Sequence, residues 1–345
     1  MDYYLIKGKF RVTKYAPDGD SIMFQANNSK HWSKVVSQYS DLFAEKLEAK
    51  NGVVQLRFQG IDALETHYSA GPLPPPKELK GKKSKKAIAP KRPNLHQPKA
   101  YGDMATDELL KLFGVTKSTW RRSGLHKYID KIEYTKGKKT VVHKTRDTDP
   151  LEGYVVVSDI ERKGRPISWV FPGESDVRDG SRLSGKKLAA MIKKSANYQL
   201  AEKGLVYPYF YFTLESILRE KLIEAVTKAR KKQLNIWSKD KTQEGVFTRS
   251  FEDIIDKHVF LPYLFRRLVK HQYKRMMEGY WLALKKKKAY KPKSSSLFLE
   301  SFYGDTNPYI FLVKEREFKR LNEIVKVTKT KITMKTSPEN IVFLS

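Results

Sequence analysis

Short apolar runs separated by turn residues recur through the first half of the chain. β-Branched and aromatic residues are frequent in these runs, and turn sequences such as Pro17-Asp18-Gly19 and Lys163-Gly164 bound them. Such runs are typical of β-strands. The predicted strands cover residues 4–12, 21–26, 53–61, 153–159 and 166–171. Strands this short predict a small β-barrel.

Apolar residues at helical spacing lie between and after these strands. The clearest stripe is formed by Leu214, Ile217, Leu218, Leu222 and Ala225. The predicted helices cover residues 40–49, 104–112, 183–195 and 214–232. We therefore expect an α+β fold centred on an OB-fold, a five-stranded β-barrel with about three packed helices.

The pattern changes beyond Trp237. A helical stripe runs from Leu264 to Leu284 with arginines and lysines on the other faces, which predicts a basic amphipathic helix. Docking against the rest of the protein and contact with nucleic acid or a membrane are both open interpretations of this helix. After a predicted linker at 291–296, strands are predicted at 309–313, 324–327 and 341–344. We expect residues 242–345 to form a C-terminal α+β extension.

The OB-fold domain is expected to cover residues 1–241 and to contain three insertions. Residues 27–51 hold one of the predicted helices. Residues 69–100 are rich in proline and lysine, cannot bury a core and are predicted to be mobile. Residues 116–149 are basic and contain a β-forming stretch at 139–142, and their role stays open.

The charge balance favours a polyanionic partner. The chain has 68 Lys and Arg against 38 Asp and Glu, a net charge of +30. Nucleic acid is the first expectation and an anionic membrane surface the second. Since there is no cysteine, disulfides, thiolate nucleophiles and cysteine metal sites are excluded. The sequence contains no apolar run long enough for a transmembrane helix and begins without a signal-peptide pattern. We expect a cytoplasmic monomer, with export that needs no signal peptide as an alternative.

Carboxylates and an arginine stand at or near the ends of predicted strands. Asp18-Gly19-Asp20 is a turn signal that would place a carboxylate at the mouth of the barrel. Alternation puts Arg57 on one face of its strand with Gln55 and Gln59. That strand runs into Gly60-Ile61-Asp62-Ala63-Leu64-Glu65-Thr66, where two carboxylates lie three residues apart. One of these two carboxylates can bind a hard cation while the other orients water. The simpler interpretation of Asp18-Gly19-Asp20 is a plain turn, and that of Arg57 is an exposed strand face.

Five motifs follow one another in a defined order. They are Asp-Gly-Asp-Ser at 18–21, Leu-Arg-x-x-Gly-Ile-Asp-Ala-x-Glu-Thr at 56–66, Lys-x-Tyr-Gly at 99–102, Lys-Gly-Arg at 163–165 and Leu-Asn-Ile-Trp-Ser at 234–238. Together they resemble the staphylococcal nuclease (thermonuclease) family over roughly residues 5–240. The resemblance implies a Ca²⁺-dependent phosphodiesterase that cuts DNA or RNA and leaves 3′-phosphate ends.

The resemblance also implies a role for each matched residue. The implied ligands of Ca²⁺ are Asp20, Asp62 and the backbone carbonyl of Ala63. Glu65 would be the general base that activates the attacking water. Arg57 and Arg165 would clamp the phosphate, a role that suits the planar donor fork of arginine.

Substrate contacts are implied at two further places. Tyr209 and Tyr211 fit a pair of tyrosines that contact the terminal phosphate and stack on a base in the family. Arg162 and Lys163 lie at the tip of the predicted hairpin, where Lys163 replaces a commonly aromatic residue; Leu64 replaces a proline between the two carboxylates. The competing interpretation of the chain is a non-catalytic OB-fold that binds single-stranded nucleic acid.

Overall fold

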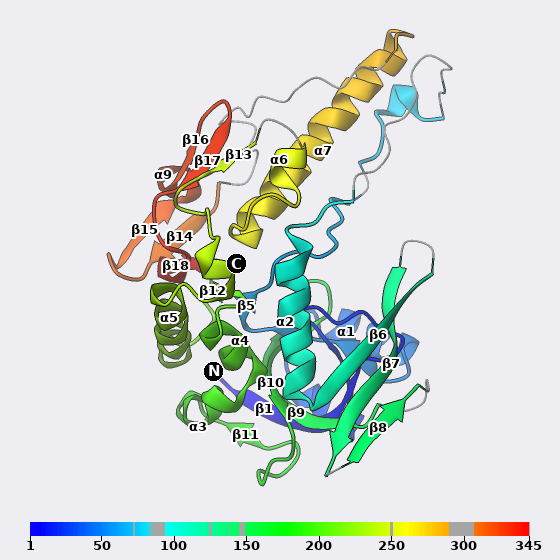
Figure 1. Ribbon diagram of the computed structural model, residues 1–345, viewed down its shortest axis with the longest axis vertical. Coiled ribbons are helices and arrows are strands. Elements are labelled where there is room, and N and C mark those ends of the chain that lie inside the picture. Colours follow the sequence, from blue (N-terminus) through cyan, green and yellow to red (C-terminus); the bar gives the residue numbers. More distant parts are fainter. Residues whose placement is uncertain are drawn as a thin grey trace. The chain divides into compact units, whose positions relative to one another are not determined.

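A computed structural model describes residues 1–71, 73–81, 83, 94–123, 126–137, 139–144, 149–248, 251–289 and 307–344. The fold is mixed α+β (Figure 1). The chain divides into two compact units. The first unit comprises Met1–Ala63 and Tyr101–Ser238, and the second unit comprises Leu64–Ala100 and Lys239–Leu344. The predicted linker at 291–296 lies outside the described residues, as does part of the segment 69–100 that was predicted to be mobile.

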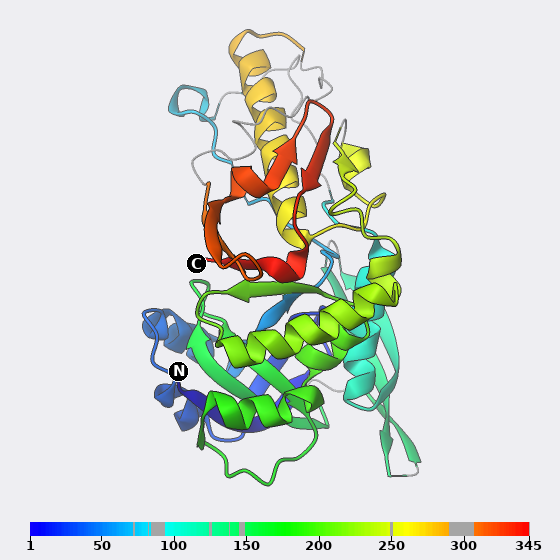
Figure 2. The same ribbon diagram turned by 90° about the vertical axis from the view of Figure 1, so that its left-hand side faces the viewer.

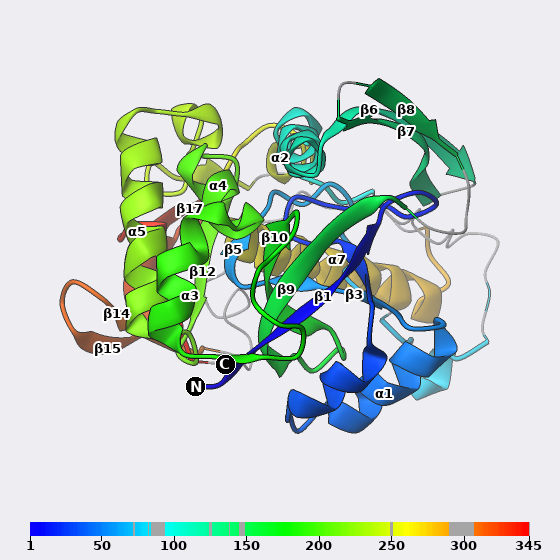
Figure 3. The same cartoon turned by 90° about the horizontal axis from the view of Figure 1, so that it is seen from below.

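A curled β-sheet forms the centre of the first unit. Its strands are β1 (Tyr3–Arg11), β2 (Met23–Ala26), β3 (Val53–Gln55), β4 (Arg57–Phe58), β9 (Leu151–Ile160), β10 (Pro166–Pro172) and β11 (Arg182–Leu183). The strand order is β3-β2-β1-β9-β10-β4, with β11 paired to β1. Only Leu56 separates β3 from β4, yet these two strands stand at opposite ends of the order. The sheet therefore curls back on itself, and the curvature of β1 and β9 is visible in Figure 3.

The predicted strand at 53–61 is divided among three partners. β3 pairs with β2, β4 pairs in parallel with β10, and β5 (Gly60–Asp62) pairs with β12 (Tyr207–Tyr211). Gly60 has a φ of +79°, and a Cβ at this position would lie 2.4 Å from Cδ1 of Leu222. A glycine permits both the turn and this close approach, so the chain leaves one sheet for the next here. The expectation of one continuous strand was wrong.

Helices pack around the curled sheet. They are α1 (Ser40–Ala49), α2 (Lys99–Leu112), α3 (Gly185–Met191), α4 (Ala196–Glu202) and α5 (Ser216–Lys231), with the short 3-10 helices η1 (Ser29–Lys34), η3 (Ile192–Lys194) and η4 (Asn235–Ser238). α1 matches its prediction at both ends. α3 and α5 lie side by side in Figures 2 and 3.

The predicted helix at 183–195 is instead strand β11 followed by α3 and η3. Ser184 caps α3 by accepting a hydrogen bond from the Lys187 N–H, and Ser195 caps α4 in the same way through Tyr198. Serine caps favour a new helix start at each position. They explain both the shortened helix and the α4 helix that the sequence analysis did not include.

The described part of segment 116–149 forms a separate antiparallel sheet beside α2 (Figure 1). Its strands are β6 (Val115–Ser123), β7 (His126–Lys136) and β8 (Lys139–His143). Buried Asp149 follows this sheet and accepts hydrogen bonds from the N–H groups of Val12 and Thr13, at 2.7 and 3.1 Å. These bonds attach the end of the segment to the end of β1.

The second unit combines helices with two small groups of strands. Its elements are η2 (Lys77–Leu79), α6 (Phe251–Ile254), α7 (Pro262–Lys285), α9 (Leu321–Ile324), η5 (Pro338–Asn340), and the strands β13 (Val246–Phe247), β14 (Tyr309–Leu312), β15 (Glu317–Arg320), β16 (Val325–Val327), β17 (Lys331–Met334) and β18 (Ile341–Phe343). β14 lies between β15 and β18, and β17 between β13 and β16. α7 confirms the predicted basic amphipathic helix, and the described residues of the segment 242–345 contain both helices and strands. No helix among them is long and apolar enough to cross a membrane.

Candidate active site

Three of the predicted site residues meet in the first unit. Arg57 on β4 donates one hydrogen bond from Nη1 to Oδ2 of Asp20 and another from Nη2 to Oδ1 of Asp62, the latter at 2.8 Å. Both carboxylates are buried: Asp62 is 0% exposed and Asp20 is 8% exposed. One guanidinium thus bridges two desolvated carboxylates, an arrangement that we call the Asp20–Arg57–Asp62 cluster.

Backbone contacts hold the turn that carries Asp20 against β4. The Asp18 N–H donates to the carbonyl of Ser21 at 2.9 Å, and the Phe58 N–H donates to the carbonyl of Asp20 at 3.0 Å. A Cβ at Gly19 would lie 2.6 Å from Cβ of Ala105 and 2.9 Å from Cβ of Ala63. The Asp-Gly-Asp turn therefore packs too closely for a larger residue at its centre, and this packing fixes the direction of the Asp20 side chain.

The two carboxylates of the cluster are oxygen donors of the kind that hard cations such as Ca²⁺ prefer. Ala63 donates its N–H to Oδ2 of Asp20 at 3.3 Å, so its backbone lies beside that carboxylate. Two carboxylates and a backbone carbonyl are the oxygen donors that Ca²⁺ prefers, and water completes its shell of six to eight ligands. Among the described residues, no three His, Asp or Glu side chains converge into a ready-made metal cage. A cation here would compete with Arg57 for the same two carboxylates.

Arg165 occupies the hairpin between β9 and β10. Its Nε donates to Oε1 of Glu161 at 2.6 Å, so the structure gives it a partner outside the Asp20–Arg57–Asp62 cluster. The tip packs against α1, because the carbonyl of Lys163 accepts a hydrogen bond from Nζ of Lys46. Arg162 and Lys163 are exposed at this tip. Arg165 precedes Ile167, the residue opposite Arg57 in the β10–β4 ladder.

Tyr209 and Tyr211 form an aromatic pair next to Arg57. The guanidinium carbon of Arg57 lies 5.9 Å from the centroid of the Tyr209 ring, within cation–π range. The two rings are 5.1 Å apart, and the Tyr211 hydroxyl donates to the Tyr209 hydroxyl at 3.2 Å. Tyr211 is 38% exposed, whereas Tyr207 is fully buried against Trp237. The exposed end of β12 therefore offers aromatic surface, and its other end belongs to the core.

A hollow of about 490 Å³ adjoins the turn that carries Asp20. Tyr15, Ser21, Lys50 and Gln55 contribute polar groups to its wall. Gln55 precedes Arg57 by two residues, and both side chains are partly exposed while the intervening Leu56 is buried. This side of the strand therefore faces solvent beside the cluster, as the alternation predicted, although Gln59 is buried.

Glu65 belongs to the second unit and is paired with an arginine there. Nη1 of Arg266 on α7 donates to Oε1 of Glu65 at 2.8 Å, and both side chains are only about one-fifth exposed. Fully buried Gln97 holds the Glu65 backbone: its N–H donates to the Glu65 carbonyl at 2.7 Å, and its side chain accepts from the Glu65 N–H at 3.3 Å. Gln97 also donates to the carbonyl of Phe260 at 2.7 Å, just before α7.

The charges of both Glu65 and Arg266 affect the pKa of Tyr68. Burial raises the pKa of its phenol above the ordinary value of 10.0; Arg266 opposes the rise and Glu65 adds to it. The ring also packs edge-on against Phe265 of α7, with centroids 6.2 Å apart. Arg266 is the site residue that the sequence analysis missed, because it was one of several basic residues on an amphipathic helix. Its partner is 201 positions away.

No family model matches this chain, and no curated protein is significantly similar to it.

Proposed function

We propose that this protein is a Ca²⁺-dependent nuclease that hydrolyses phosphodiester bonds of DNA or RNA. The observation that carries the proposal is the Asp20–Arg57–Asp62 cluster, in which two buried carboxylates and one arginine come from separate segments of the chain. Phosphodiester hydrolysis needs a cation held by oxygen ligands, fixed positive charge at the phosphate and an activated water. The first two requirements are supplied by residues that are in mutual contact.

The order of the strands supports an OB-fold as the scaffold. The sheet forms a closed path of five strands, made of β1, β2, β9, β10 and the continuous segment of β3 and β4. The path closes because β3 and β4 stand at its two ends and follow each other in the sequence. All neighbours are antiparallel except β4 and β10. A five-stranded Greek-key barrel of this kind commonly binds oligonucleotides. We propose that residues 1–241 contain this nuclease domain and that residues 242–345 extend it.

Each of the named residues has a distinct task in the proposed reaction. Asp20, Asp62 and the Ala63 carbonyl would hold Ca²⁺, which when bound neutralises charge on the scissile phosphate. Arg57 would exchange its carboxylate partners for phosphate oxygens, and Arg165 would add a second planar donor fork. Glu65 would accept the proton of the attacking water. Glu65 is three positions after Asp62, and a chain of that length spans at most about 10 Å.

Cleavage of single-stranded or heat-denatured DNA by full-length protein tests this proposal. We expect cleavage with Ca²⁺, none after EGTA is added, and loss of cleavage in Glu65→Gln and Arg165→Ala. Arg178→Ala is the control because Arg178 is an exposed arginine of the same unit. End-labelling should find 3′-phosphate products, and 5′-phosphate products would overturn the assigned roles.

A non-catalytic module that binds single strands is the second candidate. The exposed aromatic pair of Tyr209 and Tyr211 beside Arg57 favours it, because base stacking on aromatic rings is how such modules bind. Wild-type protein that shifts DNA in a gel but cuts nothing with any divalent ion would establish this candidate over the nuclease.

A further inference from the structure

Two lysine-rich segments that are distant in the sequence meet in the second unit. η2 packs on the C-terminal end of α7 through Leu79 and Leu284, with Tyr280, Trp281 and Ala283 around this contact. Lysines flank the contact on both segments. They are Lys77, Lys80, Lys83, Lys285, Lys286, Lys287 and Lys288, which we call the lysine tip.

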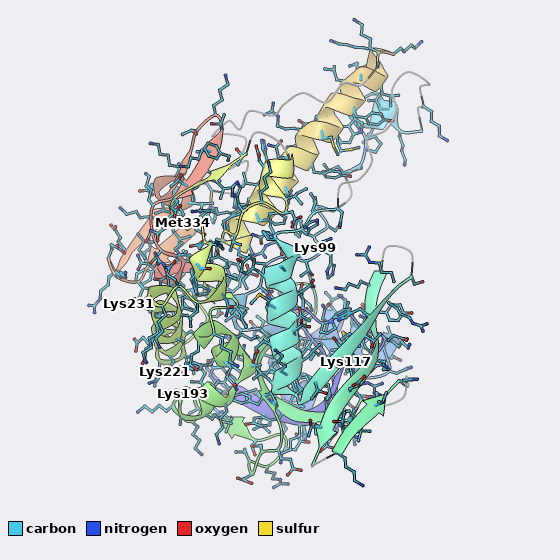
Figure 4. All side chains as sticks on the ribbon, in the orientation of Figure 1. Lys99, Lys117, Lys193, Lys221, Lys231 and Met334 are labelled. Carbon is cyan, nitrogen blue, oxygen red and sulfur yellow. The ribbon has the colours of Figure 1, made fainter. Side chains whose placement is uncertain are left out.

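The lysine tip is an uncompensated concentration of positive charge. All seven lysines are exposed, and none forms an ion pair with another residue of the described chain. Glu78, between Lys77 and Lys80, is the one acidic residue in the sequence of the two segments 77–83 and 285–288. Long side chains point outward from this end of α7 in Figure 4. Placing so many cations together costs repulsion, so an anionic partner is stabilising.

Helix capping explains only part of this charge. The N–H groups of Lys286, Lys287 and Lys288 donate to the carbonyls of Leu282, Leu284 and Ala283, and these bonds end α7 in a fixed conformation. A lysine in the last turn also complements the helix dipole. The dipole acts within that turn, however, and does not account for the lysines on the segment 77–83.

The apolar residues of α7 argue against a membrane as the partner. A helix that lies on a membrane needs an apolar face left open to lipid. In α7 the apolar face is largely covered: Leu264, Phe265, Leu268 and Val269 are buried, and Tyr280 and Trp281 near the tip are partly buried against Leu79 and Leu284. Of the large apolar residues on the helix, Leu282 is markedly exposed at 52%. Dense charge beside a largely covered apolar face fits a phosphate backbone better than a bilayer.

We propose that the lysine tip is a second contact for nucleic acid and binds the phosphate backbone of the polymer that the proposed active site cuts. The identity of that polymer as the substrate rests on the proposed nuclease function. Lysines act there as point charges, so the contact reads no sequence and releases counterions on binding. It would favour long substrates over short ones.

Binding measurements without Ca²⁺ separate this proposal from catalysis. The test compares full-length wild type with a variant in which Lys285, Lys286, Lys287 and Lys288 are all changed to glutamine. The probe is a fluorescent 40-nucleotide single strand, titrated in EDTA over a range of salt concentrations. Each phosphate contact contributes about 0.7 to the slope of log affinity against log salt for single strands. In the four-lysine variant we expect the magnitude of this negative slope to decrease by about 2–3 and the affinity at low salt to decrease 10- to 100-fold.

A matched control removes the same charge elsewhere. Lys193, Lys194, Lys231 and Lys232 are exposed in the first unit, and Figure 4 shows Lys193 and Lys231 on the same side of it. Their joint change to glutamine should lower the salt slope by less than one. Lys77, Lys80 and Lys83 changed together to glutamine should lower it by about 2, independently of the α7 segment. Equal losses in the tip and control variants, or no loss in the tip variants, would overturn the proposal.

Two further measurements distinguish the remaining outcomes. If vesicles with phosphatidylserine bind wild type but not the four-lysine variant, while both bind DNA equally, the partner is a membrane and the proposal fails. With Ca²⁺, the variant should cut a four-nucleotide substrate at the wild-type rate and show a raised KM for the 40-nucleotide strand. If wild-type binding depends on the lysine tip but wild type never cuts, the proposed contact at the lysine tip is supported and the proposed nuclease function is wrong.

Discussion

Two arginine–carboxylate sites in the described chain, the Asp20–Arg57–Asp62 cluster and the Glu65–Arg266 pair, differ in how much water surrounds them. Arg57 bridges Asp20 and Asp62, whose carboxylates are almost completely buried, and all three residues lie within the first 62 positions. Arg266 binds the single carboxylate of Glu65, and both side chains keep some contact with solvent. A buried charge depends on its partner for most of its stabilisation, whereas a partly exposed pair is worth little. Substitutions at the first site should therefore lower both the free energy of unfolding and the activity. Substitutions at the second site should lower the activity with a smaller effect on the free energy of unfolding.

Arg57→Gln should have the largest effect. Loss of one phosphate-clamping arginine typically costs a factor of about 10³ or more in turnover. The change also leaves two buried carboxylates facing each other, which should lower the free energy of unfolding by about 3–5 kcal/mol. Ca²⁺ should restore more stability to this variant than to wild type, because it replaces the missing cation. Turnover assays and urea unfolding with and without Ca²⁺ measure both effects.

The double variant Arg57→Gln/Asp62→Asn is the control for that explanation. Removing one of the two negative charges should recover part of the lost stability while cleavage stays absent. A double variant that is less stable than Arg57→Gln alone would show that repulsion between the carboxylates is not the cause.

Glu65→Gln should abolish most activity without unfolding the protein. Removing a general base costs a factor of about 10²–10⁴ in turnover. The stability change should be smaller than for Arg57→Gln, about 1–2 kcal/mol, because the Glu65–Arg266 pair keeps some solvent contact and the glutamine amide oxygen can still accept a hydrogen bond from Arg266. Glu108→Gln is the matched control, since Glu108 pairs with Lys203 and its side chain is as exposed as that of Glu65. It should leave turnover within about twofold, as no chemistry is assigned to Glu108 or Lys203; equal losses in both variants would contradict the role of Glu65.

The contrast between the sites also separates what was predictable from what was not. The long strands of the curled sheet and the helices α1, α2, α5 and α7 follow from local signals, namely apolar runs, turn residues and helical periodicity. The breaks at Gly60, Ser184 and Ser195 have local causes too, namely a positive φ and two serine caps, but periodicity alone does not reveal them. The pairing of Glu65 with Arg266 has no local cause. Periodicity marks α7 as amphipathic without indicating which arginine of its polar face meets a carboxylate 201 positions earlier.

Arg266→Gln should have a moderate effect on the rate. We expect turnover to fall about tenfold with KM unchanged, because Glu65 loses the donor that orients its side chain and small misplacements of a catalytic group are costly. Arg266→Lys should recover part of the rate by restoring one donor. A change in KM alone, or the same loss in Arg267→Gln on the next position of α7, would point to a general effect of charge instead.

Tyr68→Phe should have the smallest effect, and it measures how dry the surroundings of the Glu65–Arg266 pair are. Burial raises the pKa of Tyr68 above 10.0 in the folded protein. Above pH 10 the unfolded chain therefore loses this proton while the folded chain keeps it, so wild-type stability declines as pH rises from there towards the folded pKa. Tyr68→Phe lacks this contribution and should lose less stability than wild type between pH 8 and 10.5 in parallel urea titrations. Parallel declines in the two proteins would mean that water reaches Tyr68, and that the pair beside it is as solvated as an ordinary surface ion pair.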